Sequence, residues 1–115
     1  MDQTELKKRT KQFGLCVMKM VGALPNDSVG RAIGGQLVRS GTSVGANYRA
    51  ACRGRSKAEF IAKLGIVIEE ADESGYWMEL IIEGGLLPTD KVEQLLDEAN
   101  QITAIMVASR KSAQK

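Results

Sequence analysis

The 115-residue sequence contains no histidine, which narrows the chemistry it can carry. Without histidine there is no Ser-His-Asp or Cys-His catalytic arrangement, no Glu-x-x-His motif of carboxylate di-iron bundles and no His-ligated zinc. The acidic run from Glu69 to Glu73 offers hard oxygen ligands, but such a run is more often a solvated face or the partner of an arginine face. We therefore expect no enzymatic activity, no cofactor and no metal site.

Cysteine, proline and aromatic residues are also scarce, with two Cys, two Pro, two Phe, two Tyr and one Trp. Cys16 and Cys52 lie within apolar helical patterns, which favours buried reduced thiols over a disulfide. No apolar run approaches the ~18 residues of a membrane span, and the N-terminus is too charged for a signal peptide. These features predict a single cytoplasmic domain over residues 1–115, with an aliphatic core and no membrane association.

Apolar residues recur at three- and four-residue spacing along four segments of the chain. This spacing predicts amphipathic helices over about 4–24, 28–53, 57–84 and 89–111. Because the connections are short and no segment has the pattern of a strand, we expect an all-α fold, an antiparallel up-down-up-down four-helix bundle.

The predicted helix ends have recognisable capping residues. Thr4 is the expected N-cap of the first helix, and Asp27 or Ser28 that of the second. Gly54 suits a left-handed C-cap, and Ser56-Lys57-Ala58-Glu59 has the form of a capping box. The C-terminal residues 110–115 are expected to fray into a basic tail.

The second predicted helix has three faces. Its expected core face consists of Val29, Ile33, Leu37, Val44, Tyr48 and Ala51. The opposite face carries Arg31, Arg39, Arg49 and Arg53. Between them lies a stripe of small residues, Gly34, Gly41, Gly45 and Cys52. Because small residues let two backbones come together, we expect another helix to pack closely on this stripe.

The third predicted helix is acidic and carries two apolar stripes. The first stripe consists of Phe60, Leu64, Val67, Ala71, Met78 and Ile82, and the second consists of Ile66, Trp77, Leu80 and Ile81. A helix with two apolar stripes usually has two partners, so we expect one stripe to face the bundle and the other a second subunit.

Charge is divided along the chain: residues 1–55 carry ten Lys or Arg against three acids, whereas residues 56–85 carry seven acids against two Lys. This division predicts an anion-binding surface made by Arg31, Arg39, Arg49, Arg53, Arg55 and Lys57. The basic residues of segment 7–11 would join it if the first helix shares that face. The scarcity of available aromatics argues against base stacking and favours contact with nucleic-acid phosphates.

Two other uses of the arginines remain open at this stage. They can pair with the acidic face of the third helix, in the same subunit or a neighbour, as Arg49 would with Glu73. They can also bind small anions.

Three stretches of the sequence resemble the family of 23S rRNA intervening-sequence proteins. They are RTKQF at residues 9–13, the run QLVRSGTSVGANYRAACRGRSKAEFIAKLGIVIEEADESGYWMELI at 36–81, and VASRK at 107–111. The family signature falls on Ser40, Ser43, Gly45, Asn47, Tyr48, Ala51, Arg53, Ser56, Phe60, Leu64, Glu70, Ala71, Glu73 and Trp77. No catalytic role is attached to any of them.

The resemblance implies a bacterial four-helix bundle that assembles as a ring-like homopentamer. It also implies a distant relation to the accessory variability determinant of diversity-generating retroelements, a basic pentamer that binds a reverse transcriptase and nucleic acid. Together with the charge pattern, it predicts a non-enzymatic scaffold for RNA or DNA, accessory to a reverse transcriptase or another nucleic-acid enzyme. The alternative is a structural or protein-interaction module whose arginines form intersubunit salt bridges.

Overall fold

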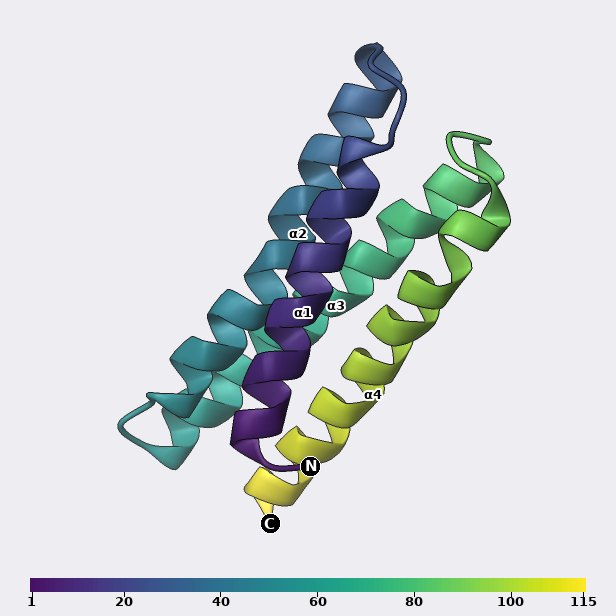
Figure 1. Cartoon of the computed structure of the whole chain (residues 1–115). Helices are drawn as coiled ribbons and strands as arrows, with labels where there is room; N and C mark the ends of the chain where they lie inside the picture. The colour runs from purple at the N-terminus through teal and green to yellow at the C-terminus, as the bar shows by residue number, and fades with distance from the viewer.

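The computed structural model describes residues 1–115, which form four α-helices and no strand. The helices are α1 (Gln3–Gly22), α2 (Ser28–Cys52), α3 (Lys57–Glu83) and α4 (Glu93–Gln114), and a 3-10 turn, η1 (Thr89–Lys91), precedes α4. They make an elongated body of 45 × 20 × 19 Å. Both chain ends and the α2–α3 connection lie at one end of it (Figure 1). The all-α fold class is confirmed.

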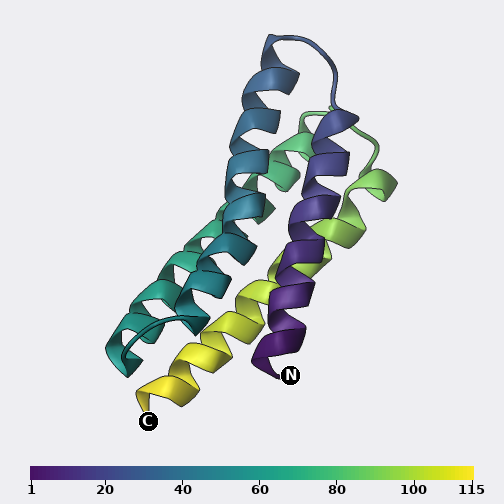
Figure 2. The ribbon, with the colours of Figure 1, turned by 60° about the vertical axis from the view of Figure 1, so that its left-hand side comes forward.

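The helices pack in chain order, and the bundle is open on one side. Helix α2 lies between α1 and α3, and α3 lies between α2 and α4, whereas α1 and α4 touch each other far less. Figure 1 shows α1 and α4 diverging toward the α3–α4 connection, and in the turned view of Figure 2 α4 crosses behind α1. No helix combines the length and apolar character that crossing a bilayer requires.

The core is mostly aliphatic, as expected, and contains 17 buried hydrophobic residues contributed by every helix. Its largest fully enclosed side chains include Phe13, Leu37, Met78 and Ile102. Both cysteines are free, but each is half-buried rather than buried.

The N-terminal ends of α1 and α2 are capped by aspartates. Asp2 Oδ1 accepts the Glu5 N–H at 2.8 Å, so α1 begins at Gln3 and the expected cap at Thr4 is wrong. Asp2 acts as the cap because its carboxylate accepts a backbone N–H that has no partner within the helix. It also places a negative charge at the positive end of the helix dipole. Asp27 caps α2 in the same way, through the Gly30 N–H at 2.8 Å.

The connection from α2 to α3 is tight, but it contains no left-handed residue. The N–H groups of Arg53 and Gly54 donate to carbonyls three residues back, at 3.1 and 3.0 Å, and the last turn of α2 tightens without a positive φ. The left-handed cap expected at Gly54 is therefore wrong, and the one glycine with positive φ is Gly85, at 70°. The α3 cap at Ser56 is as expected, since Ser56 Oγ accepts the Glu59 N–H at 3.1 Å.

Helix α3 ends in a double-glycine turn. The Gly85 N–H donates to the Ile82 carbonyl and the Leu86 N–H to the Ile81 carbonyl, at 3.1 and 2.9 Å, with Gly85 left-handed. This is the Schellman arrangement, which only a residue without Cβ adopts at little cost. The following segment is not α-helical from residue 89, because η1 comes first. Helix α4 then continues to Gln114, so the predicted end at 111 and the expected fraying of residues 110–115 are wrong.

The stripe of small residues on α2 packs against another helix, as the sequence predicted, and the structure shows that this helix is α1. A methyl group added at Gly41 would lie 2.7 Å from both Cγ atoms of Val17. One added at Gly45 would lie 3.2 Å from the Thr10 carbonyl. Gly41 leaves no room for a methyl group beside the Val17 side chain, and at Gly45 the two backbones are in close contact.

Some apolar residues of the predicted stripes on α2 and α3 are not buried in the structure. Val29 was expected in the core but is 56% exposed, because the first turn of α2 reaches past the α3–α4 connection (Figures 1 and 2). In the second stripe of α3, Ile81 is fully buried, Trp77 is half-buried and Ile66 remains exposed.

Candidate nucleic-acid interface

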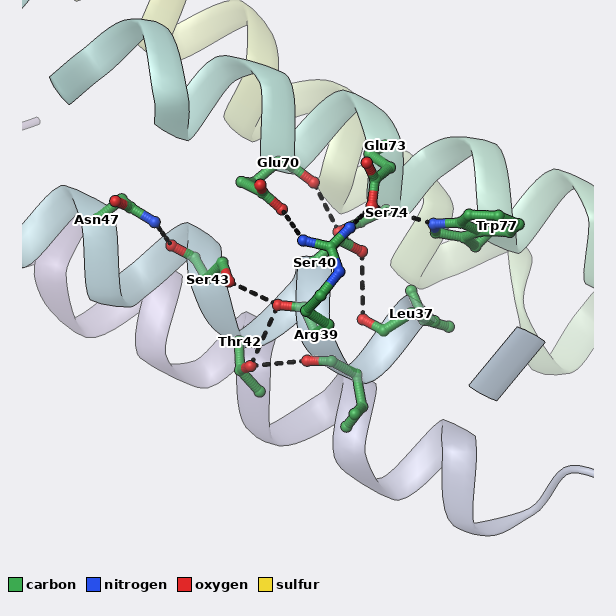
Figure 3. Close-up of polar contacts among 11 residues, drawn as sticks. Leu37, Arg39, Ser40, Thr42, Ser43, Asn47, Glu70, Glu73, Ser74 and Trp77 are labelled. Carbon is green, nitrogen blue, oxygen red and sulfur yellow. Dashed lines mark hydrogen bonds and ion pairs between the residues drawn. The ribbon is translucent and has the colours of Figure 1, made fainter. Parts of the chain in front are cut away.

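The arginines of α2 lie beside two different helices, α1 and α3. On the α3 side, acidic residues of α3 balance the arginine charge. Arg39 reaches across the α2–α3 seam, where its guanidinium hydrogen-bonds Glu73 and lies 3.4 Å from Glu70 Oε2 (Figure 3). Glu73 also accepts the indole N–H of Trp77 at 3.2 Å. Arg49 does not pair with Glu73 within this chain, because it lies on the α1 side of α2, and a pair between subunits stays a prediction.

Three other signature residues, Ser40, Ser43 and Asn47, make hydrogen bonds at the α2–α3 seam or along α2 beside it. Beneath Arg39, the buried hydroxyls of Ser40 and Ser74 lie 3.1 Å apart, and Ser74 donates to the Glu70 carbonyl. Ser43 donates to the Arg39 carbonyl and Asn47 to the Ser43 carbonyl, at 2.7 and 2.9 Å (Figure 3). These hydrogen bonds all stay within the α2–α3 pair.

Two further signature residues lie toward the core and α1. Tyr48 is buried in the core, and this burial raises the pKa of its phenol. Gly45 provides the close backbone approach to α1 described above. The signature thus marks how α2 packs on its neighbours.

On its other side, α2 shares a basic groove with α1. The groove has a volume of about 650 Å³ and is lined by five cations, Lys7, Lys8, Lys11, Arg49 and Arg53. No acidic residue lines it, and none of the five makes a salt bridge within the chain. We call it the α1–α2 groove.

The floor of the α1–α2 groove is made of small residues, Gly14, Gly45, Ala46 and Thr42. Because the two helices touch at their glycines, no large side chain rises between the flanking cations. An extended anion can therefore lie between the two helices and meet cations from both sides. The sequence predicted that the lysines of α1 would join the anion-binding surface only if α1 shared that face of α2. The structure places three of them beside Arg49 and Arg53.

The other predicted cations lie outside the groove. Arg31 is at the opposite end of α2, where it donates to Asn26 Oδ1 at 3.2 Å. Arg55 and Lys57 are exposed at the α2–α3 connection, and Lys57 donates to the Lys115 carbonyl. Just before α3, the Glu59 carboxylate accepts the Arg55 N–H at 3.2 Å.

Arg9 is the one basic residue of segment 7–11 that turns away, toward α4. Its guanidinium makes two hydrogen bonds of 2.7 Å to the Glu98 carboxylate and a third to Gln101. The hydrogen bond to Glu98 is the main reason that the pKa of Arg9 is raised. This pair joins two helices that make few other contacts with each other.

A second groove, between α1 and α4, was not anticipated. It measures about 910 Å³ and is lined by apolar residues such as Phe13 and Leu95, with both acids and lysines at its rim. Its mixed charge distinguishes it from the α1–α2 groove.

The fold and its surface define a class: a small all-α, four-helix protein with one uniformly basic groove. Residues 2–108 match the model of the 23S rRNA-intervening sequence protein family, and the chain belongs to that family. Among solved structures it is similar to a protein of unknown function from the S23 ribosomal protein family of Bacteroides thetaiotaomicron VPI-5482, determined at 1.70 Å. The two share 31% identity and a TM-score of 0.89, over 96% of this chain and 99% of the other. No match is found among the curated proteins.

Proposed function

We propose that the protein is a non-enzymatic scaffold that binds the sugar-phosphate backbone of nucleic acid in the α1–α2 groove. The observation that carries the proposal is the lining of this groove by five cations and no acid. Arginine and lysine side chains on two facing helices can each meet a phosphate oxygen, and binding to a polyanion releases its counterions. The family name, which refers to an intervening sequence of 23S rRNA, points to the same class of ligand.

The proposal includes self-association into a homo-oligomer, a pentamer by the family resemblance, because a ring would place several copies of the groove around one nucleic acid. A protein partner such as a reverse transcriptase would then contact the assembly outside the groove. We place this assembly in the cytoplasm, where the two free cysteines stay reduced.

The alternative function is a structural module whose arginines form salt bridges. The specific observation in its favour is Arg39, whose charge is already matched by Glu70 and Glu73. In an oligomer, the exposed acids Glu69 and Asp72, which make no ion pair within the chain, would take Arg49 or Arg53 of a neighbouring copy.

The test is a binding titration over a salt series, with the mass of the protein in solution measured in parallel. A labelled RNA and a labelled DNA are titrated with wild-type protein and with the double variant Arg49→Gln/Arg53→Gln. We expect the double variant to bind about a hundredfold more weakly at low salt, since each charged hydrogen bond contributes roughly a factor of ten. Its plot of log affinity against log salt should be shallower by roughly two.

The matched control is Arg31→Gln, the same substitution on the same helix but outside the groove. It should leave affinity and salt dependence nearly unchanged. An unchanged salt slope in the double variant, or no binding by the wild type at low salt, would contradict the proposal. Loss of assembly in the double variant without any nucleic-acid binding would favour the salt-bridge module.

A further inference from the structure

The α1–α2 groove is lined by two exposed apolar side chains as well as by its cations. Leu15 and Met18 are 51% and 53% exposed, and both line the groove. They are three residues apart on α1 and therefore lie on the same side of the helix. Neither belongs to the core.

The cations and the apolar pair occupy different halves of the groove. Gly45 lies against Thr10, and Gly14 lies against Thr42, with a distance of 3.6 Å from an added methyl group to Thr42 Cα. With the direction of the chain reversed between α1 and α2 (Figure 1), this register places Arg49 and Arg53 beside the first turns of α1. Met18 lies seven residues beyond Lys11, roughly 10 Å farther along the helix axis.

A duplex and a single strand would use these halves differently. A duplex presents phosphates and sugars at its surface, and its base faces are stacked inside, so it would leave the apolar half without a partner. A single strand exposes the flat apolar faces of its bases, and these can rest on apolar side chains.

Resting on the proposed function, we infer that the α1–α2 groove selects single-stranded nucleic acid. Phosphates lie against the cationic half, and at least one unpaired base lies on Leu15 and Met18. The contact is hydrophobic and has no hydrogen-bond readout, so it accepts any base. The natural ligand on this reading is a loop, an end or an unpaired stretch.

Fluorescence anisotropy of the 115-residue protein tests this with four labelled 12-mers: single-stranded RNA and DNA of one sequence, and the duplex of each. We expect the single strands to bind about tenfold more tightly than the duplexes. The variant Leu15→Ser/Met18→Ser should bind single strands about fivefold more weakly, with an unchanged salt slope and unchanged duplex binding. Because both side chains are exposed, this variant should fold normally.

Val29→Ser is the matched control, since Val29 is equally exposed but lies outside the groove. It should change neither affinity. As a second readout, photo-crosslinking of a thiouridine-containing single strand, followed by trypsin, should label the peptide of residues 12–19, which holds both apolar side chains between Lys11 and the cleavage site at Lys19.

The outcomes separate this inference from the function on which it rests. If duplex and single strand bind equally, and both depend on Arg49 and Arg53, the phosphate-binding proposal stands and the single-strand inference is wrong. A serine variant that weakens both forms equally would also overturn the inference. If neither form binds and the arginine variant instead changes the mass in solution, the groove belongs to a second copy of the chain, and both proposals fall.

Discussion

The two flanks of α2 use the same residue type in opposite ways. On the α3 flank, Arg39 forms ion pairs with Glu70 and Glu73, so its charge is balanced within the molecule. On the α1 flank, Arg49 and Arg53 face a helix whose nearby side chains are lysines, and their charge remains available. An arginine on a helix surface is therefore defined by the neighbouring helix as much as by its own position.

The packing of the two flanks differs as well. The α1 side relies on glycines that bring backbones together, and this close approach keeps the groove floor low. The α3 side is held by buried serine hydroxyls and a surface ion-pair cluster. Three predictions test this difference, and a fourth tests the ion pair between α1 and α4.

The largest effect should come from filling the close contact between α1 and α2. Replacing Gly41 by Leu places a branched side chain where Val17 already lies, and we expect a loss of about 3 kcal/mol in the free energy of unfolding. The matched control is Gly35→Ala, because a methyl group there meets nothing within 4 Å. It should stabilise α2 by up to about 1 kcal/mol through helix propensity. Urea unfolding at one fixed protein concentration measures both, and equal stabilities would show that the close contact is unimportant.

The next effect separates the two arginine classes directly. Arg49→Gln should weaken nucleic-acid binding about tenfold, or about 1.4 kcal/mol, because an unpaired guanidinium is lost. Arg39→Gln should change affinity by less than about twofold, since its charge is already neutralised by two carboxylates. The same anisotropy titration compares them, and equal losses for the two variants would remove the distinction between the flanks.

A smaller effect is expected for the one ion pair that bridges α1 and α4. The side chains of Arg9 and Glu98 are 24% and 27% exposed, and they form a bidentate pair of charge-assisted hydrogen bonds. A double-mutant cycle with Arg9→Gln and Glu98→Gln should give a coupling energy of about 1 kcal/mol. Purely additive losses would mean that the pair does not hold α1 to α4.

The smallest effect should appear at the exposed pair on the α3 flank. The Arg39 and Glu73 side chains are 51% and 37% exposed, so solvent screens their attraction. The cycle with Arg39→Gln and Glu73→Gln should give about 0.5 kcal/mol or less. The single change Glu73→Gln should also raise nucleic-acid affinity slightly, by less than about threefold, because it partly frees Arg39. A decrease in affinity would contradict this view of the α3 flank.

Much of the fold could be predicted because helices depend on local sequence. Apolar spacing located all four helices, Asp27 and Ser56 were recognisable as caps, and the glycine stripe of α2 predicted a close helix contact. The errors lie at the ends. Thr4 and Asp2 are equally good caps by residue type, and Gly54 is a good candidate for a left-handed turn that the tight geometry did not require.

The candidate site was only partly predictable. Six cations were proposed, of which Arg49 and Arg53 lie in the α1–α2 groove, while Arg39 is paired and the others lie elsewhere. Helical spacing placed four arginines on one broad face but could not say which edge of that face would meet acids. The position of Leu15 and Met18 beside the cations also depends on how α1 is rotated against α2.

The sequence by itself determined the all-α class, the faces of each helix and the separation of basic from acidic segments, since each follows from residue type and the 3.6-residue period. Only the tertiary structure decided which helices are neighbours, and hence that Arg39 is neutralised while Arg49 and Arg53 join the lysines of α1. The physical reason is that the electrostatic energy of a charged side chain depends mainly on the charges within a few ångströms of it. Those charges come from segments far apart in the chain, brought together by packing.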